Sequence, residues 1–289
     1  MTTINNADKE KIVILGHTGF VGRYLYRKLK NEPMFEVYGF SSKEVNLLNL
    51  GTYQKLADVC DGETTIIMTA AILRNDLPAL NNNIKMALNL AKFLSHNKIK
   101  RLIYTNSISV YGNGSKTPIT ENSPFNPDSF YSSAKACAEL IFKRICDESN
   151  TALTTFRMGK IYGKGDITSP IYIFSRKIVS GEPIEIYGDG SHRLYPVHQN
   201  DLLSVIKKVI SEEISRDYNI TPSSGITLLE LARLLFELSG RKVEIKYKPV
   251  VNHPISLTFN TSKLKTVFKN FPSVSLEKGI KEYFASIIP

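Results

Sequence analysis

The sequence predicts an α/β protein: a Rossmann-type, doubly wound parallel sheet followed by a smaller C-terminal lobe. Short β-rich runs alternate with helix-like stretches, a glycine-rich turn joins the first run to the first helix, and glycine and proline interrupt the alternation after about Gly159. Alternating strands and helices fold into a parallel sheet with helices on both faces. We therefore expect one domain over residues 1–160 and a lobe over residues 161–289, some segments of which return to the sheet.

The expected strands are short runs rich in β-branched and aromatic residues. The expected helices repeat their apolar residues at helical spacing, as Val21, Leu25 and Leu29 do in the first one. In chain order the strands are Lys11–Leu15, Glu36–Phe40, Thr65–Ala70, Arg101–Thr105 and Ala152–Arg157. The helices are Phe20–Lys30, Leu77–Leu94 and Tyr131–Asp147.

The composition excludes several classes of protein. The chain has 289 residues, 42% of them hydrophobic and 22% charged, which is typical of a globular protein and not of a disordered, collagen-like or coiled-coil chain. Cys60, Cys137 and Cys146 are odd in number and have no CxxC spacing, so we expect no disulfide framework, no metal site and a reducing, cytoplasmic setting. Apolar stretches such as Ile66–Leu73 are too short to cross a membrane.

The formal charge of +10 suggests nucleic-acid binding, but the distribution of charge argues against it. Residues 1–150 contain 18 basic and 14 acidic side chains and the remainder contains 19 and 13, so the excess forms no block or arm. We expect no nucleic-acid partner. A dispersed positive surplus suits anionic small molecules equally well.

The turn from Gly16 to Gly22, with sequence GHTGFVG, lies between the first strand and the first helix. Glycine lets the chain turn tightly and lets backbone N–H groups approach a pyrophosphate, while the helix N-terminus attracts negative charge. Three glycines alone would also fit a helix cap or close helix packing, but their place in a βαβ unit favours a dinucleotide site. The expected contacts are Gly16, Thr18, Gly19, Phe20, Val21 and Gly22.

The end of the second strand bears on the choice of cofactor. A site for NAD(H) expects a carboxylate there, whereas this chain has Ser41, Ser42 and Lys43, and two hydroxyls with an ammonium would hold a 2′-phosphate. The sequence therefore predicts NADP(H) as the preferred cofactor. NAD(H) is the alternative because Glu44 follows, and Ser41 and Ser42 would also suit a simple turn.

Two further patterns carry candidate acid–base chemistry. Tyr131 and Lys135 are four residues apart, so they share a helix face. A nearby ammonium, with the positive nicotinamide of an oxidised cofactor, is expected to lower the pKa of the phenol toward the range of an acid–base catalyst. Ser107 follows the fourth strand, at the sheet edge where ligands bind, and could donate a hydrogen bond to a substrate carbonyl. Surface packing for the Tyr–Lys pair and a plain loop at Ser107 are the alternatives.

Taken together, these patterns resemble the extended short-chain dehydrogenase/reductase superfamily, in its branch of nucleotide-sugar epimerases, dehydratases and reductases. The resemblance covers about residues 11–201. The matching motifs are GxxGxxG at Gly16–Gly22, Ser-x-x-VYG from Ser107 to Gly112, YxxxK at Tyr131 and Lys135, R-x-x-x-x-YG at Arg157–Gly163 and GdG…R…D at Gly188–Asp201.

The resemblance implies a role for individual residues. Ser107, Tyr131 and Lys135 would be catalytic. Cofactor contacts, besides the turn and the Ser41–Lys43 segment, would come from Asn46, Leu47, Ala70, Ala71, Asn83, Tyr131, Lys135, Met158 and Ile161. The substrate, a nucleotide-diphosphate sugar, would contact Ser107, Ser109, Lys160 and Arg193. The resemblance also implies a homodimer packed through the helices Leu77–Leu94 and Tyr131–Asp147.

Departures from the family pattern narrow the reaction. Ile108 and Ser109 stand where the 4,6-dehydratases carry an Asp–Glu pair, so dehydration is not expected. The turn and the segment Glu44–Asn49 look most like the GDP-fucose synthases, whose epimerising Cys and His are replaced here by Ser109 and the Ser169–Pro170 region. A serine hydroxyl is a poor base for removing a proton beside a carbonyl.

These comparisons lead to one preferred function and two alternatives. The preferred function is NADPH-dependent reduction of the C4 keto group of a nucleotide-linked, GDP-type 4-keto-6-deoxy hexose or heptose, without epimerisation or dehydration, in the synthesis of sugars for lipopolysaccharide or capsule. The alternatives are an NAD-dependent nucleotide-sugar 4-epimerase and a non-catalytic sensor of NADP.

Overall fold

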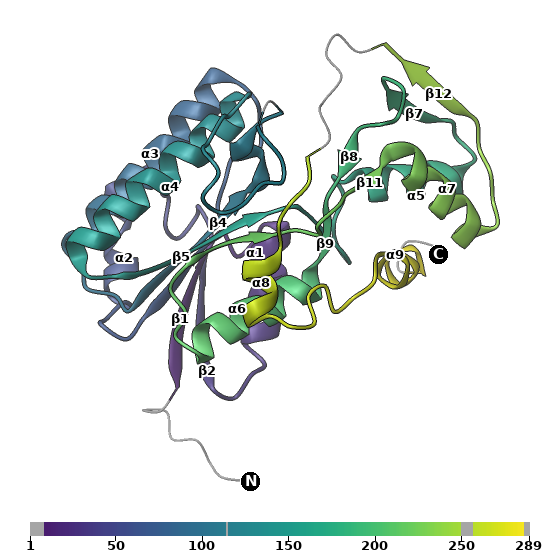
Figure 1. Ribbon diagram of the computed structural model, residues 1–289. Coiled ribbons are helices and arrows are strands. Elements are labelled where there is room, and N and C mark those ends of the chain that lie inside the picture. Colours follow the sequence, from purple (N-terminus) through teal and green to yellow (C-terminus); the bar gives the residue numbers. More distant parts are fainter. Residues whose placement is uncertain (1–8, 114, 250–256, 286–289) are drawn as a thin grey trace. The chain divides into compact units, whose positions relative to one another are not determined.

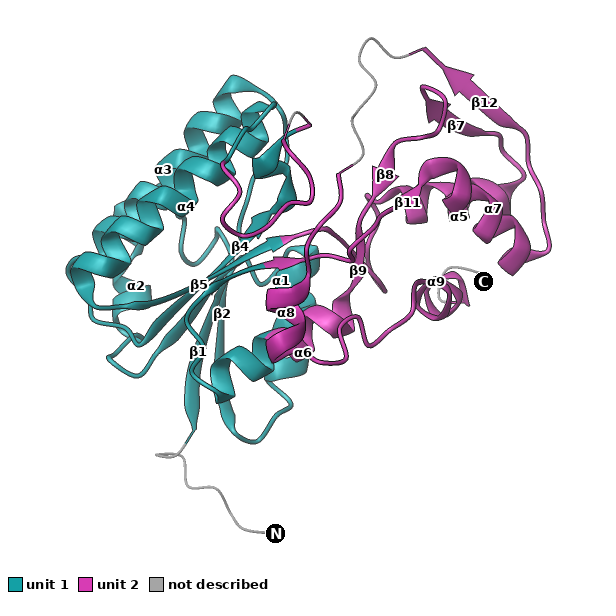
Figure 2. Ribbon diagram, in the orientation of Figure 1, with its two compact units in different colours: residues 1–112, 125–157, 206–218 teal, residues 113–124, 158–205, 219–289 magenta. Residues whose placement is uncertain are grey.

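The computed structural model describes residues 9–113, 115–249 and 257–285. The chain forms two compact units, each built from segments that are far apart in the sequence (Figures 1 and 2). The first unit consists of residues 1–112, 125–157 and 206–218, and the second of residues 113–124, 158–205 and 219–289. The chain therefore leaves the first unit after Gly112 and returns to it at Phe125.

A six-stranded sheet forms the centre of the first unit, in the order β10-β5-β4-β3-β1-β2. The strand bounds are β1 (Glu10–Leu15), β2 (Phe35–Phe40), β3 (Thr65–Met68), β4 (Arg101–Ser107), β5 (Ala152–Met158) and β10 (Asp217–Ile220). β1 pairs in parallel with β2 and with β3, and β3 in parallel with β4. The strand order reverses at β1, and ligands bind at such a switch point, beyond the carboxyl ends of the strands. The predicted doubly wound fold is confirmed.

Helices cover both faces of this sheet. They are α1 (Phe20–Leu29), α2 (Gln54–Ala57), α3 (Leu77–Leu94) and α4 (Phe130–Ser149), with short 3-10 turns η2 (Leu50–Thr52) and η3 (Ile108–Tyr111). α3 and α4 lie side by side on one face, and α1 lies on the other (Figure 1). Both long helices begin at side-chain caps: Asp76 accepts the N–H of Ala79 at 2.8 Å, and Ser129 forms a capping box with Ser132.

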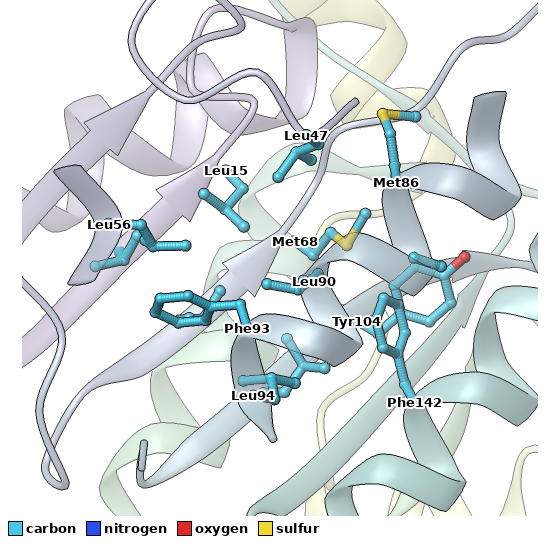
Figure 3. Packing of buried hydrophobic residues seen from close by; sticks show 14 of the residues in the cluster. Leu15, Leu47, Leu56, Met68, Met86, Leu90, Phe93, Leu94, Tyr104 and Phe142 are labelled. Atoms are coloured by element: carbon cyan, nitrogen blue, oxygen red, sulfur yellow. The ribbon is translucent and has the colours of Figure 1, made fainter. Parts of the chain in front are cut away.

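The strand period of two places alternate residues of β1 on opposite faces of the sheet. Val13 and Leu15 belong to a hydrophobic cluster that also contains residues of α2, α3 and α4, among them Leu56, Leu90 and Phe142 (Figure 3). Burying each such side chain contributes about 1.5–3 kcal/mol. The carboxyl ends of β1 and β3 are therefore anchored against α3 and α4.

The second unit has its own hydrophobic core, to which Tyr162, Ile186, Leu231 and Tyr283 belong. Its strands form three two-stranded sheets, which pair β11 with β8, β12 with β7, and β6 with β9. The bounds are β6 (Lys160–Tyr162), α5 (Pro170–Ser180), β7 (Ile184–Tyr187), β8 (Arg193–Leu194), β9 (Pro196–His198), α6 (Gln199–Ser211, which continues into the first unit), β11 (Ile226–Thr227), α7 (Leu228–Ser239), β12 (Ile245–Lys248), α8 (Ser262–Val267) and α9 (Leu276–Ala285).

The five expected strands and three expected helices are present, with ends displaced by two residues at most. The third strand ends at Met68 instead of Ala70. The alternation of helix and strand also resumes after Gly159, in α6 and β10, where glycine and proline punctuation concealed it. Within the described ranges no helix is long and apolar enough to cross a membrane, and no group of three or more His, Cys, Asp or Glu side chains could hold a metal ion.

Candidate active site

The glycine-rich turn between β1 and α1 has no room for side chains at two positions. Gly16 has a φ of +91°, and a Cβ there would lie 2.8 Å from the backbone nitrogen of Ala70. A Cβ on Gly22 would lie 2.3 Å from the carbonyl oxygen of Gly16. Only glycine accommodates both the left-handed backbone and this approach of the helix to the turn. The turn is therefore held tightly against the end of β3.

The N-terminus of α1 is open to an anion. Gly19 is the N-cap residue and offers no side chain, and the first turn of the helix contains no acidic residue. The N–H groups of a first helical turn have no intrahelical partner, and the helix dipole adds partial positive charge there. Phe20, Val21 and Gly22 occupy this turn. A phosphate or pyrophosphate is the ligand that such a terminus favours.

A cavity of about 430 Å³ lies at the carboxyl ends of β1, β2 and β3. The predicted cofactor residues that line it are Gly16, Thr18, Gly19, Ser41, Ser42, Asn46, Leu47, Ala70 and Ala71. The residues that sequence reasoning missed are Leu15, Phe40, Val45, Leu48, Thr69, Ile72 and Met86. Several of these end a strand or follow one, so their place at the carboxyl edge of the sheet was the signal that could have found them.

Other predicted cofactor residues do not line the cavity. The side-chain amide of Asn83 accepts the N–H of Ile72 and donates to the carbonyl oxygen of Ile72, both at 2.9 Å. Asn83 thus holds the loop after β3, to which the lining residues Ala70 and Ala71 belong. Phe20, Val21, Gly22 and Lys43 are not lining residues either. The turn with its helix N-terminus and this cavity together fit the pyrophosphate and adenosine parts of a dinucleotide.

The loop after β2 contains an acidic group. The Glu44 carboxylate accepts hydrogen bonds from the backbone N–H of Ser41, at 2.8 Å, and from the Ser41 hydroxyl. These bonds lower the pKa of Glu44, so the carboxylate is charged near neutral pH. Glu44, the residue that kept NAD(H) as an alternative, is therefore a charged group next to the Ser41–Lys43 segment. Ser42 and Lys43 are exposed, while Ser41 is buried.

Ser107 ends β4 and begins the turn η3. Its hydroxyl oxygen accepts hydrogen bonds from the Ser109 hydroxyl at 2.9 Å and from the Ser109 N–H at 3.2 Å. A hydroxyl has one proton to donate and two lone pairs to accept with. Because Ser109 occupies the accepting side, the proton of Ser107 remains available to a substrate oxygen. Ser109 thus contacts Ser107, and its contact with substrate stays a prediction.

The Val110-Tyr111-Gly112 segment that follows is anchored in the first unit. The Asn126 N–H donates to the carbonyl oxygen of Val110 at 2.9 Å. Gly112 has a φ of +60°, and a Cβ there would lie only 1.8 Å from the carbonyl oxygen of Asn126. The backbone at Gly112 therefore lies very close to the backbone at Asn126, which explains why a glycine follows Tyr111.

Lys135 brings α4 to the carboxyl end of β4. Its ammonium donates to the carbonyl oxygen of Thr105 at 2.6 Å and lies 4.4 Å from the centroid of the Tyr104 ring. The side chain is only 5% exposed, and burial lowers its pKa to about 7, although Glu139 acts in the opposite direction. Lys135 therefore changes charge close to physiological pH.

Tyr131 lies one helical turn before Lys135. Burial raises the pKa of its phenol to about 12 in the protein alone. Loss of hydration causes this shift. The expected lowering of the pKa by the ammonium together with a positive nicotinamide stays a prediction for the complex with cofactor. The phenol is protonated at neutral pH, which suits a proton donor.

The remaining predicted residues lie in the second unit. Met158 and Ile161 belong to β5 and β6. The ammonium of Lys160 donates to the Thr168 hydroxyl at 3.2 Å. The Arg193 guanidinium donates to the carbonyl oxygen of Gly225 at 2.5 Å and lies 3.8 Å from the Glu230 carboxylate. Arg193 thus already has partners within its own unit.

A comparison with protein-family models settles the class. The model described as the NAD dependent epimerase/dehydratase family matches residues 12–221, well over half of the chain. The chain belongs to this family. The expected extended short-chain dehydrogenase/reductase class, and with it a nicotinamide-dependent oxidoreductase, is confirmed at this level.

The chain is similar to proteins with several different names. Protein CapI of Staphylococcus aureus is 22% identical, and the match covers 94% of this chain and 97% of that protein. A dTDP-4-dehydro-6-deoxy-D-allose reductase of Streptomyces bikiniensis is 28% identical over 42% of this chain and 39% of its own length. The crystal structure of a Thermus thermophilus UDP-glucose 4-epimerase in complex with NAD superimposes with a TM-score of 0.85, at 18% identity and with 96% and 98% of the two chains covered. That identity supports the fold alone.

Proposed function

We propose that this protein is an NADPH-dependent reductase of the C4 keto group of a nucleotide-linked 4-keto-6-deoxy sugar, with GDP as the nucleotide. The proposal rests mainly on β4 and α4, which carry a hydroxyl with an available proton, a protonated phenol and a buried lysine in the same unit as the cavity. A curated relative named as a 4-keto-sugar reductase supports the same reaction class.

The reaction adds a hydride to the carbonyl carbon and a proton to its oxygen, so that the keto group becomes a secondary alcohol. A bound nicotinamide supplies the hydride. The Ser107 hydroxyl donates a hydrogen bond to the carbonyl oxygen and stabilises the charge that develops there. The Tyr131 phenol gives its proton to that oxygen, and the Lys135 ammonium then stabilises the phenolate until solvent returns the proton.

The same residues argue against two related reactions. Dehydration needs an acid–base pair beside the Ser107 segment, where this chain has Ile108 and Ser109. The Ser109 hydroxyl is engaged with Ser107, and its intrinsic pKa is too high for a base that removes a proton beside a carbonyl. We infer a reductase that neither epimerises nor dehydrates, acting in the synthesis of sugars for cell-surface polysaccharides.

The cofactor preference is part of the proposal. Ser42 lines the cavity, and Lys43, which follows it in the chain, is exposed; they supply a hydroxyl and an ammonium for a 2′-phosphate. The Glu44 carboxylate, bound to Ser41, favours the unphosphorylated cofactor instead. This observation favours a second candidate function, a C4 epimerase that keeps NAD(H) bound and both oxidises and reduces the sugar.

A homodimer completes the proposal. Leu77 and Leu88 on α3 and Leu140 on α4 are 61%, 52% and 58% exposed, so the two adjacent helices present apolar side chains that a second copy could cover. Sedimentation of the purified protein should give a dimer, and the double variant Leu88→Lys, Leu140→Lys should shift it toward the monomer. A wild-type monomer at micromolar concentration would refute this part.

The function is tested by following the absorbance of NADPH, and separately of NADH, with a panel of 4-keto-6-deoxy sugars linked to GDP, UDP, dTDP or CDP and generated in place by dehydratases. Oxidation of NADPH with one nucleotide, and a product with a C4 hydroxyl by NMR, is the expected result. The absence of turnover across the panel would overturn the reductase. Conversion of a nucleotide sugar to its C4 epimer would favour the second candidate, and cofactor binding without either reaction would favour a sensor.

A further inference from the structure

A cluster of four charged side chains lies in the first unit; its central pair is buried, whereas Lys143 and Asp217 are 39% and 22% exposed. Glu139 of α4 and Arg157 of β5 are 0% and 1% exposed, and they pair through two contacts, Nε to Oε2 at 3.0 Å and Nη2 to Oε1 at 2.5 Å. Lys143 lies 3.1 Å from the Glu139 carboxylate and 2.8 Å from that of Asp217, which is 3.3 Å from Arg157. The two cations and two anions balance.

The side-chain amide of Asn106 connects the cluster to the candidate active site. The Asn106 side chain donates to the Glu139 carboxylate at 2.6 Å and, with its own oxygen, accepts the N–H of Ser107 at 2.8 Å. Arg157 adds a second connection, because it donates to the Tyr111 hydroxyl at 2.8 Å on the far side of η3. Both ends of the Ser107 turn are therefore tied to one buried carboxylate and its guanidinium.

The same carboxylate belongs to the helix face that carries the acid–base pair. Tyr131, Lys135, Glu139 and Lys143 follow one another at intervals of four residues, so they form one row along α4. Asn106 and Thr105 are adjacent in β4, and the Lys135 ammonium donates to the carbonyl oxygen of Thr105. Glu139 is thus connected to two residues of the candidate site: to Ser107 through Asn106, and to Lys135 as its neighbour one turn away on α4.

Packing alone does not explain such a cluster. Removing charges from water is expensive, and apolar residues of similar volume often stabilise a core equally well or better than a buried ion pair. A carboxylate that keeps four donors in fixed directions, however, fixes the relative positions of the elements that carry them. Here these elements are β4, β5 and α4.

We propose that Glu139 is a positioning residue: through Asn106 it sets the place of Ser107, and along α4 it provides the negative charge that holds Lys135 as an ammonium. Its effect on turnover rests on the proposed function, whereas its effect on Lys135 does not.

The surroundings of Lys135 support the second part. The titratable groups that face it are Tyr131 and Glu139 from its own helix and Tyr104 from β4. Of these, only Glu139 is a carboxylate, and it pairs with the Arg157 guanidinium. Behind Glu139 stand Arg157, Lys143 and Asp217. Glu139 raises the pKa of Lys135 against the effect of burial, so the loss of its charge should lower that pKa further.

The test compares Glu139→Gln with Asp217→Asn. Both remove one negative charge from the cluster and keep the side-chain shape, but Asp217 contacts neither Asn106 nor Lys135. The titration of Lys135 is followed by NMR of ¹³Cε-labelled lysine in the protein without cofactor, with Lys135→Met to assign the signal. Glu139→Gln should lower the Lys135 pKa by about one pH unit, and Asp217→Asn should leave it nearly unchanged. Equal shifts in both variants, or none in Glu139→Gln, would overturn the proposal.

The connection to Ser107 is tested separately with Asn106→Ala, which breaks the bridge and keeps every charge. It should lower kcat by about 10- to 100-fold, with KM changed less than about threefold, and should leave the Lys135 titration in place. Wild-type kcat in Asn106→Ala would refute the positioning of Ser107. If the wild-type protein reduces no keto sugar, the proposed function fails, and the lysine titration still decides the role of Glu139. If Glu139→Gln does not fold, Glu139→Asp, which retains the charge, must restore both folding and the Lys135 titration.

Discussion

Replacement of Lys135 by methionine should change how the stability of the protein depends on pH. In the unfolded chain this lysine has an ordinary pKa near 10.5, and in the fold burial lowers it to about 7. Between these two values the unfolded state binds one proton more than the folded state, so wild-type stability should rise with pH across this range. Methionine fills similar space and does not titrate. The slope should therefore be absent from the variant.

The size of this effect follows from the pKa difference. One pH unit corresponds to about 1.4 kcal/mol. The free energy of unfolding of the wild type should therefore rise by about 5 kcal/mol over the whole range through this side chain, and by about 2 kcal/mol between pH 7 and 9. No discount for solvent screening is needed, because Lys135 is 5% exposed. At about 2–4 °C per kcal/mol, the Tm difference between wild type and Lys135→Met should change by about 4–8 °C over that interval.

Differential scanning calorimetry at half-unit steps from pH 6 to 9 measures this difference, since the titration of all other groups cancels between the two proteins. Lys207→Met is the matched control, because Lys207 is a partly exposed lysine that pairs with Glu32 at 2.7 Å. Its curve should run parallel to that of the wild type. If the Lys135→Met curve is also parallel, burial does not lower the pKa of Lys135, and the reasoning from its surroundings is refuted.

Three further predictions concern the site. Tyr131→Phe should lower kcat about 10²- to 10⁴-fold and leave cofactor affinity within a few-fold; an active variant in the NADPH assay would remove the phenol from the mechanism. Gly22→Ala should weaken cofactor binding at least tenfold in a fluorescence titration, because its Cβ would lie 2.3 Å from a carbonyl oxygen, whereas Gly62→Ala, whose Cβ has no neighbour closer than 3.9 Å, should bind normally. Lys43→Ala should reduce, and Glu44→Gln should increase, the ratio of kcat/KM for NADPH to that for NADH; movement of both in the same direction would contradict the assigned roles.

The fold and the glycine turn could be predicted because they depend on local patterns. Strand periodicity, the apolar spacing of the first helix and three glycines at fixed intervals all lie within short stretches of sequence. Asn83 and Ser109 show the limit of this approach. The sequence indicated that they belong to the site, but only the three-dimensional arrangement reveals that Asn83 holds Ile72 and Ser109 holds Ser107.

The electrostatics of the site are harder to predict from sequence, for a physical reason. The spacing of Tyr131 and Lys135 gives their common helix face correctly, but a pKa depends on hydration, which is a property of everything packed around the side chain. Arg157 pairs with Glu139, and also with Asp217 sixty residues further along the chain, only in the folded unit. The interval of four residues from Lys135 to Glu139 was the one local signal that could have pointed to the cluster.

The close approach of the backbone at Gly112 and Asn126 bears on which part of this chain can change in length. Because Val110 and Asn126 are hydrogen-bonded to each other, the excursion over residues 113–124 begins and ends at a fixed point of the first unit. A segment with pinned ends can change in length at little entropic penalty, about 0.6 kcal/mol for each doubling. Chimeras that change the length of this segment but keep Ile119, whose N–H donates to the carbonyl oxygen of Thr258 at 2.8 Å, should therefore keep the stability of the first unit.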